Sequence, residues 1–154
     1  MMKMLVCTDG SEQSQKALEK SLIFAQGPAV SEVGIIHVYD GKMDLSASAW
    51  GGRDYSVTEE DLKRLRQMHE EQKAIRENIL NEASKVFEEK NIKAVTMLEE
   101  GHPSHTIVEV AAEKGYDIIV IGSRGLGGLK KLFLGSVSNS VAQEAKNCCV
   151  VIVK

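Results

Sequence analysis

The chain has 154 residues, of which 43% are hydrophobic and 27% charged, and its formal net charge is -3. These values are typical of one globular domain spanning 1–154 with a single core, and the negative charge argues against nonspecific nucleic-acid binding. No apolar run approaches the roughly 20 residues of a membrane span, and the start is too short for a secretory signal, so we expect a cytoplasmic protein.

Strand-like and helix-like segments alternate from one end of the chain to the other. The apolar runs at 4–8, 33–38, 117–122 and 149–153 are nearly continuous, which is typical of strands buried on both faces of a parallel sheet. A fifth run, 92–98, alternates and contains a lysine, which indicates an edge strand. The order predicts the α/β class, as a doubly wound domain whose five-stranded parallel sheet has helices on both faces.

Four helices are expected between these strands. Ser11 can cap the first, and the third fits between Pro103 in its first turn and Gly115 at its C-terminal end. The second covers 58–90 and opens with Thr58 and Asp61, which resemble a capping box. The fourth runs over 136–146.

The second helix and the segment before it do not fit easily into a compact domain. Residues 40–57 are rich in Gly, Ser and Asp and predict a long loop. The helix would be about 50 Å long, whereas a domain of this size has a radius of gyration of about 15 Å. It must overhang or break, and its mostly charged first half should be the exposed part.

Cysteine and histidine offer no clear reactive centre. Cys7, Cys148 and Cys149 lie in apolar runs without a CxxC spacing, so we interpret them as small buried hydrophobes. His37, near the end of a strand, is interpreted as a core residue. His102 and His105 flank Pro103, where surface or capping positions are expected.

The segment 122–136, GSRGLGGLKKLFLGS, follows a buried strand and precedes a helix. In open parallel sheets, ligands bind beyond the carboxyl ends of strands where the strand order reverses. Glycines let backbone N–H groups approach an anion, and the helix that begins at Ser136 offers free N–H groups to a phosphate. Ser138 could add a hydroxyl, and Arg124 lies nearby. Neither the P-loop nor the dinucleotide fingerprint matches this spacing.

The spacing that is present is G-x2-G-x9-G-S. Together with TDGS at 8–11, IIHV at 35–38, EGHP at 100–103 and DIIVIGSRG at 117–125, it resembles the universal stress protein family, in its ATP-binding branch. The resemblance covers nearly the whole chain. It implies a sheet ordered 3-2-1-4-5, with ATP or another adenine nucleotide across the ends of the first and fourth strands.

The resemblance also implies roles for individual residues. Asp9 would contact the ribose or phosphate side, and the backbones of Thr8 and Val38 would flank the adenine. The phosphates would be cradled by Gly122, Gly125, Gly135, Ser136, Val137 and Ser138. Cys7 stands where members of this branch often have proline. Independently of the resemblance, Asp9 could simply shape a turn or cap the first helix.

Two functions share this site. The first is a nucleotide-dependent regulatory protein of the stress response, in which ATP changes the loops at 40–57 and 123–134 and a partner protein responds. The alternative is slow Mg²⁺-dependent ATP hydrolysis or phosphoryl transfer, with Asp9 holding the metal. A response-regulator receiver would need several acids after the first strand, where only Asp9 stands.

The last strand predicts self-association. Residues 149–153 form an apolar edge in the 3-2-1-4-5 order, and exposed apolar edges invite pairing. As in similar family members, we expect a homodimer in which this strand pairs antiparallel with its two-fold mate.

Overall fold

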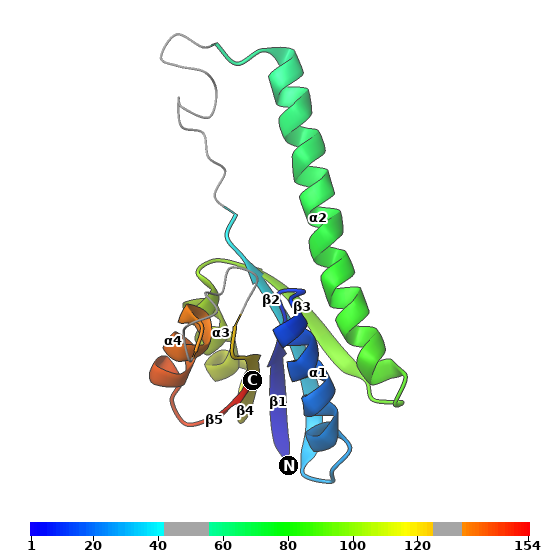
Figure 1. Cartoon of the computed structure of the whole chain (residues 1–154), viewed down its shortest axis with the longest axis vertical. Coiled ribbons are helices and arrows are strands. Elements are labelled where there is room, and N and C mark those ends of the chain that lie inside the picture. Colours follow the sequence, from blue (N-terminus) through cyan, green and yellow to red (C-terminus); the bar gives the residue numbers. More distant parts are fainter. Residues whose placement is uncertain (42–55, 125–133) are drawn as a thin grey trace.

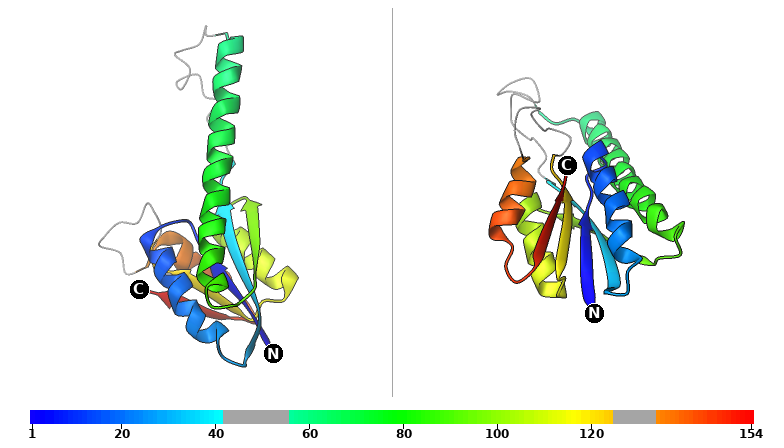
Figure 2. Two further views of the ribbon diagram at one scale, coloured as in Figure 1. Left: turned by 90° about the vertical axis from the view of Figure 1, so that its right-hand side faces the viewer. Right: turned by 60° about the horizontal axis from the view of Figure 1, so that its bottom comes forward.

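The computed structural model describes residues 1–41, 56–124 and 134–154. Its sheet has five parallel strands in the order β3-β2-β1-β4-β5, which confirms the expected fold class. The strands are β1 (Met2–Cys7), β2 (Val30–Tyr39), β3 (Ala94–Glu100), β4 (Ile118–Gly122) and β5 (Cys149–Val153). The helices are α1 (Glu12–Ala25), α2 (Glu59–Glu88), α3 (Pro103–Lys114) and α4 (Ser136–Glu144). Helices α1 and α2 cover one face of the sheet, and α3 and α4 cover the other (Figures 1 and 2).

The central strands bury side chains on both faces, which explains why they are continuously apolar. Along β1, Met4 and Val6 join the core cluster under α1 and α2. The alternate residues, Leu5 and Cys7, join the cluster under α3 and α4. Because successive side chains of a strand point to opposite faces, every position of such a strand must be apolar. The alternating strand β3 lies at an edge of the sheet, as expected.

The helix ends follow the sequence signals. The Ser11 hydroxyl accepts a hydrogen bond from the Ser14 N–H at 3.2 Å and caps α1. Thr58 and Asp61 form a reciprocal capping box at the start of α2. Gly115 ends α3 in the left-handed conformation, with φ of 68°. These local signals therefore set one boundary of each of the first three helices, the start of α1 and α2 and the end of α3.

Helix α2 overhangs the domain and does not break (Figure 1). It is one unbroken helix of 30 residues, and its N-terminal part projects beyond the body of the molecule (Figure 1). Near its C-terminal end, Leu80, Ala83 and Phe87 are buried against the sheet. Among the described residues, no helix combines the length and apolar character needed to cross a bilayer.

The three cysteines occupy different environments. Cys7 is buried, and burial, assisted by the nearby charge of Asp9, raises the pKa of its thiol. Cys148 is half-buried, and burial raises its thiol pKa as well. Cys149 is exposed. The interpretation of all three as buried hydrophobes is wrong for Cys149, because it opens β5 at the edge of the sheet.

The two halves of α2 should differ sharply in what they contribute to stability. Phe87 is 0% exposed, so Phe87→Ala should lower the free energy of unfolding by about 3–5 kcal/mol. Ile75 lies on the same helix at 53% exposure, and Ile75→Ala should cost about 0.5 kcal/mol. Urea unfolding of both variants measures the difference. Similar losses at the two positions would contradict the boundary between anchored and projecting parts of α2.

Candidate functional site

The candidate site lies where the strand order reverses. β1 lies in the middle of the sheet and pairs with β2 on one side and with β4 on the other. The chain goes from β1 outwards to β2 and β3, and then returns to the other side of β1 to form β4. Because all strands are parallel, β1 and β4 end at the same edge, and α1 and α4 begin there (Figure 1). Crevices at such reversal points are the usual ligand sites of open α/β sheets.

The turn after β1 is held by its own side chains. The Ser11 N–H donates to Asp9 Oδ1 at 2.9 Å, and the Gly10 N–H donates to Thr8 Oγ1 at 3.3 Å. The Thr8 hydroxyl in turn donates to Ser14 Oγ at 3.2 Å. Gly10 has φ of 80°, a conformation that favours glycine. Asp9 therefore has the turn-shaping role that the sequence left open, and this places its carboxyl group at the edge of the sheet.

His37 fixes the backbone at the end of β1. Its Nδ1 lies 2.9 Å from the Thr8 carbonyl oxygen, and its side chain is buried. A carbonyl oxygen only accepts, so Nδ1 carries the proton in this contact. The Thr8 N–H donates to the Ile36 carbonyl at 2.9 Å, which ties the same residue to β2 a second time. His37 is thus a satisfied core histidine, as expected, and it orients the residue predicted to flank adenine.

The connection after β4 is closed by a clamp that consists of Ser123, Gly135 and Ser138. The Gly135 N–H donates to the Ser123 carbonyl oxygen. The Ser138 hydroxyl lies 3.0 Å from that same oxygen and 3.1 Å from the Gly135 carbonyl oxygen. Ser138 is buried, and its single hydroxyl proton is already used within the clamp. The clamp sets where α4 begins, a role that the sequence did not reveal for Ser123.

Two predicted glycines have packing reasons of their own. A Cβ on Gly122 would lie 2.8 Å from the backbone carbonyl carbon and oxygen of Gln13, in the first turn of α1. A Cβ on Gly135 would lie 3.0 Å from the Ser123 carbonyl oxygen. Gly122 therefore lets α1 approach β4, and Gly135 lets the clamp close. The third predicted glycine, Gly125, lies outside the described residues.

The N-terminus of α4 supplies donors at this edge. Gly135 is the N-cap and makes no side-chain cap, while the Asn139 N–H is the first to donate to the Gly135 carbonyl. The N–H groups of the first helical residues, Ser136 and Val137, have no partner within a helix, and the helix dipole adds positive potential there. Ser136 is exposed, so its hydroxyl and N–H can both meet a ligand.

The remaining predicted residues lie around the same edge. Val38, near the end of β2, packs half-buried against the core on the α3 side, and Arg124 follows the clamp residue Ser123. The described parts of the chain contain no group of three or more His, Cys, Asp or Glu placed to hold a metal ion. The role of Asp9 as a metal ligand stays a prediction.

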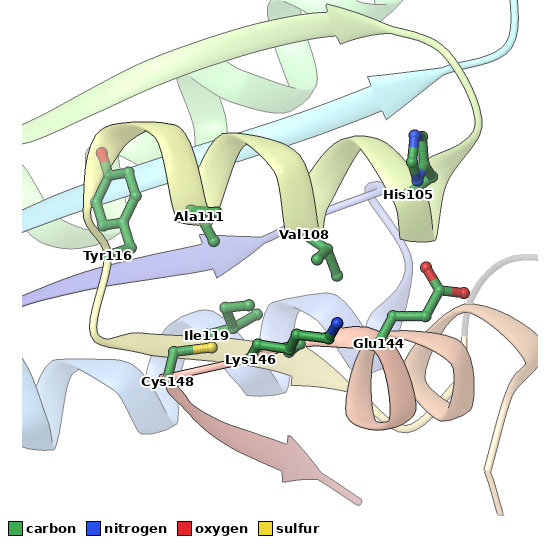
Figure 3. A pocket seen from close by; sticks show the side chains of 10 residues that line it. His105, Val108, Ala111, Tyr116, Ile119, Glu144, Lys146 and Cys148 are labelled. Atoms are coloured by element: carbon green, nitrogen blue, oxygen red, sulfur yellow. The ribbon is translucent and has the colours of Figure 1, made fainter.

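A separate cavity of about 420 Å³ lies between α3 and α4 (Figure 3). Val108 and Ala111 of α3, Ile119 of β4 and Cys148 give it an apolar lining, and His105 lies at one end. His105 is exposed and its Nε2 lies 3.1 Å from Glu109 Oε1, as expected of a surface residue. None of the site residues expected from the sequence lines this cavity.

Comparison with known proteins finds members of one family. All of the chain, residues 1–154, matches the model of the Universal stress protein family. It is 39% identical over 152 residues to universal stress protein YxiE of Bacillus subtilis, covering 99% of this chain and 98% of the relative.

Solved structures of other universal stress proteins share the fold. MJ0577, a universal stress protein of Methanocaldococcus jannaschii, superposes with a TM-score of 0.68 and 31% identity, over 99% of this chain and 95% of that chain. A universal stress protein family member from Arabidopsis thaliana, with AMP bound, superposes with a TM-score of 0.67 and 20% identity, over 100% and 92%.

The hydrogen bond from His37 to Thr8 should be worth a measurable part of the stability. His37→Leu removes the donor and leaves the Thr8 carbonyl unsatisfied, so the free energy of unfolding should fall by about 1–3 kcal/mol. His37→Asn keeps an N–H donor near the position of Nδ1 and should retain more stability. Urea unfolding compares the two. Long-range ¹H–¹⁵N NMR spectra of the neutral imidazole should show the proton on Nδ1, and a proton on Nε2 instead would contradict the assignment.

Proposed function

The chain belongs to the universal stress protein family. On that premise we propose that it binds an adenine nucleotide, with ATP as the preferred ligand, at the edge of the sheet where β1 and β4 end. The bound nucleotide makes it a regulatory protein whose state a partner protein reads. The observation that carries this proposal is the N-terminus of α4, held by the Ser123–Gly135–Ser138 clamp beside the turn at Asp9.

The geometry supports separate positions for the phosphates and for the adenine ring of the nucleotide. N–H groups of Ser136 and Val137 suit phosphate oxygens, because they combine hydrogen bonding with the positive end of the helix dipole. Thr8 and Val38 lie at the ends of neighbouring strands, β1 and β2, where their backbones suit the flat adenine ring. The relative from Arabidopsis thaliana with AMP bound supports an adenine nucleotide as the class of ligand.

The proposal covers binding and regulation. A hydrolase acting at the same edge would need Asp9 to hold Mg²⁺ together with the phosphates of the nucleotide. One oxygen of that carboxylate already accepts the Ser11 N–H. That contact is compatible with either function, because each carboxylate oxygen has two lone pairs. We propose the regulatory role because the site supplies hydrogen-bond donors for phosphates, and hydrolysis stays the alternative, tested by turnover at saturating ATP and Mg²⁺.

Ser136 is the position at which phosphate binding can be tested without disturbing the fold. It is the first residue of α4, where proline is tolerated because the N–H has no partner within the helix. The preceding Gly135 has φ of -69° and ψ of 161°, which is compatible with a following proline. Substitutions at Gly122 are less informative, because a side chain there would collide with the backbone of α1.

Ser136→Pro removes both the N–H and the hydroxyl of this residue and should weaken the binding of ATP and AMP by at least about 10- to 100-fold, because each hydrogen bond to a charged group is worth about 1.5–3 kcal/mol. Ser136→Ala removes only the hydroxyl and should weaken binding less. Adenosine, which lacks phosphate, should bind the wild-type chain and Ser136→Pro equally. Isothermal titration calorimetry measures all three ligands. Wild-type affinity of Ser136→Pro for ATP would sink the assignment of α4 as the phosphate site.

We also propose that the chain forms a homodimer through the free edge of β5. The Cys149 N–H donates to the Asp117 carbonyl, just before β4, at 2.8 Å, and the Val153 carbonyl accepts from the Ser123 N–H, just after β4, at 2.7 Å. In a parallel strand, alternate residues bond the same neighbour. The backbone groups of Val150 and Ile152 therefore point away from β4, towards a second chain.

Ile152→Pro should convert the dimer into a monomer, because it removes an outward N–H and leaves the bonds to β4 intact. Ile152→Ala alters the side chain alone and should remain dimeric. Sedimentation velocity at micromolar concentration distinguishes the two masses. A wild-type chain that sediments as a monomer, or a dimeric Ile152→Pro variant, would refute pairing through β5.

A further inference from the structure

The projecting part of α2 carries apolar side chains that the core does not use. Leu62, Met68 and Ile75 are 45%, 60% and 53% exposed. By contrast, the buried apolar residues of this helix are Leu80, Ala83 and Phe87, near its other end. The left-hand view of Figure 2 shows the helix rising away from the sheet. The apolar residues therefore mark a surface that lies outside the domain.

Two of these exposed residues, Met68 and Ile75, belong to a set with the spacing of a coiled-coil seam that also includes the half-buried Leu65. Leu65, Met68, Gln72 and Ile75 succeed one another at steps of three, four and three residues, and we call them the α2 stripe. Steps of this kind keep one narrow face of a helix towards a partner helix. On the helix surface, Arg64 and Glu71 flank the same side of the α2 stripe, seven residues apart, and both are exposed.

We propose that the α2 stripe is a self-association surface, on which the projecting segment 58–75 packs antiparallel against the same segment of a second copy of this chain. In that packing, Leu65 of each copy lies opposite Met68 of the other. The same register brings Arg64 of each copy against Glu71 of the other, so two opposite-charge pairs form by symmetry.

The arrangement of charges favours the antiparallel orientation. In a parallel pair Glu71 would face Arg76, but the Arg76 guanidinium already stacks on the ring of Tyr39 at 3.8 Å from its centroid. A parallel pair would also bring the two domains side by side at the same end of the helices. The antiparallel register keeps the overlap within the projecting segment and leaves the domains at opposite ends.

The association should be weak and sensitive to salt. Only the two Leu65–Met68 layers of the register are fully apolar. The next layer places Gln72 opposite Asp61, which is buried and accepts hydrogen bonds from Thr58 in the capping box. The last layer places Ile75 opposite Thr58. A seam with two apolar layers should bury less than the roughly 1,200 Å² of a stable interface. Exposed charge pairs lose most of their attraction at high ionic strength. This surface therefore suits a reversible contact between copies.

A charge exchange tests the register. Arg64→Glu and Glu71→Arg should each raise the dissociation constant of this association by about fivefold or more, since each replaces two attractive pairs by two repulsive ones. The double variant Arg64→Glu/Glu71→Arg should return it to within about twofold of wild type. Lys63→Glu makes the same change of charge on the opposite side of the helix and should have little effect. Sedimentation equilibrium over a wide concentration range, at low and high salt, measures the constants.

The outcomes separate this contact from pairing through β5, because none of these substitutions touches β5. An equal effect of Lys63→Glu, or a double variant that does not recover, would overturn the proposal. The proposal would also be overturned if the self-association of the wild-type chain had the same dissociation constant as that of Arg64→Glu, or if the wild-type chain did not self-associate at all.

Disulfide formation tests the orientation. Under mild oxidation, a mixture of Leu65→Cys and Met68→Cys chains should form the disulfide between positions 65 and 68, identified by peptide mass mapping. Leu65→Cys alone should not cross-link at position 65. A disulfide between two copies of position 65 would mean parallel packing and would refute the register.

Discussion

The burial of β1 and β4 on both faces is the constraint on which the rest of the molecule depends. Strands of this kind need helices above and below the sheet, and each crossover returns the chain to start the next strand in the same direction. All carboxyl ends therefore meet at one edge. The turn at Asp9 and the clamp at Ser123 are neighbours for this reason, although more than a hundred residues separate them in the chain. The position of the candidate site follows from how the core is covered.

Much of this architecture could be predicted because its causes are local. Continuous apolar runs predicted the buried strands, and the capping residues at Ser11 and Thr58 predicted where two helices begin. The excess length of α2 predicted only that the helix must overhang or break, and the structure shows the overhang (Figure 1). The strand order did not follow from periodicity, which indicates the buried faces of a strand and not its neighbours. That order was implied by the family resemblance, and the structure confirms it.

The parts of the site that could not be predicted rest on contacts between distant segments. The glycine at 122 was predicted from its motif, yet its close approach to Gln13 of α1 appears only in the folded chain. Ser138 was expected to donate to phosphate, but its hydroxyl is held by the carbonyl oxygens of Ser123 and Gly135. No pattern in the sequence marks Ser123 as their partner. Cys149 was misplaced because its apolar run was interpreted as buried, although the strand order implied by the resemblance puts 149–153 at an edge, where Cys149 is exposed.

The clamp and the core end of α2 each hold a segment in place outside the core. The clamp holds the start of α4, and the buried end of α2 holds its projecting N-terminal part. In the clamp, the Ser138 hydroxyl and the Gly135 N–H both donate to the Ser123 carbonyl oxygen. These bonds order the start of α4 in the absence of a ligand. A ligand that meets ordered donors loses less free energy on binding. Helix α2 is anchored where Leu80 and Phe87 are buried, and extending a formed helix by further turns costs little free energy. The capping box at Thr58 ends that growth. The core therefore sets the direction of α2, and its N-terminal end extends past the carboxyl edge of the sheet, where the candidate site also lies (Figure 1).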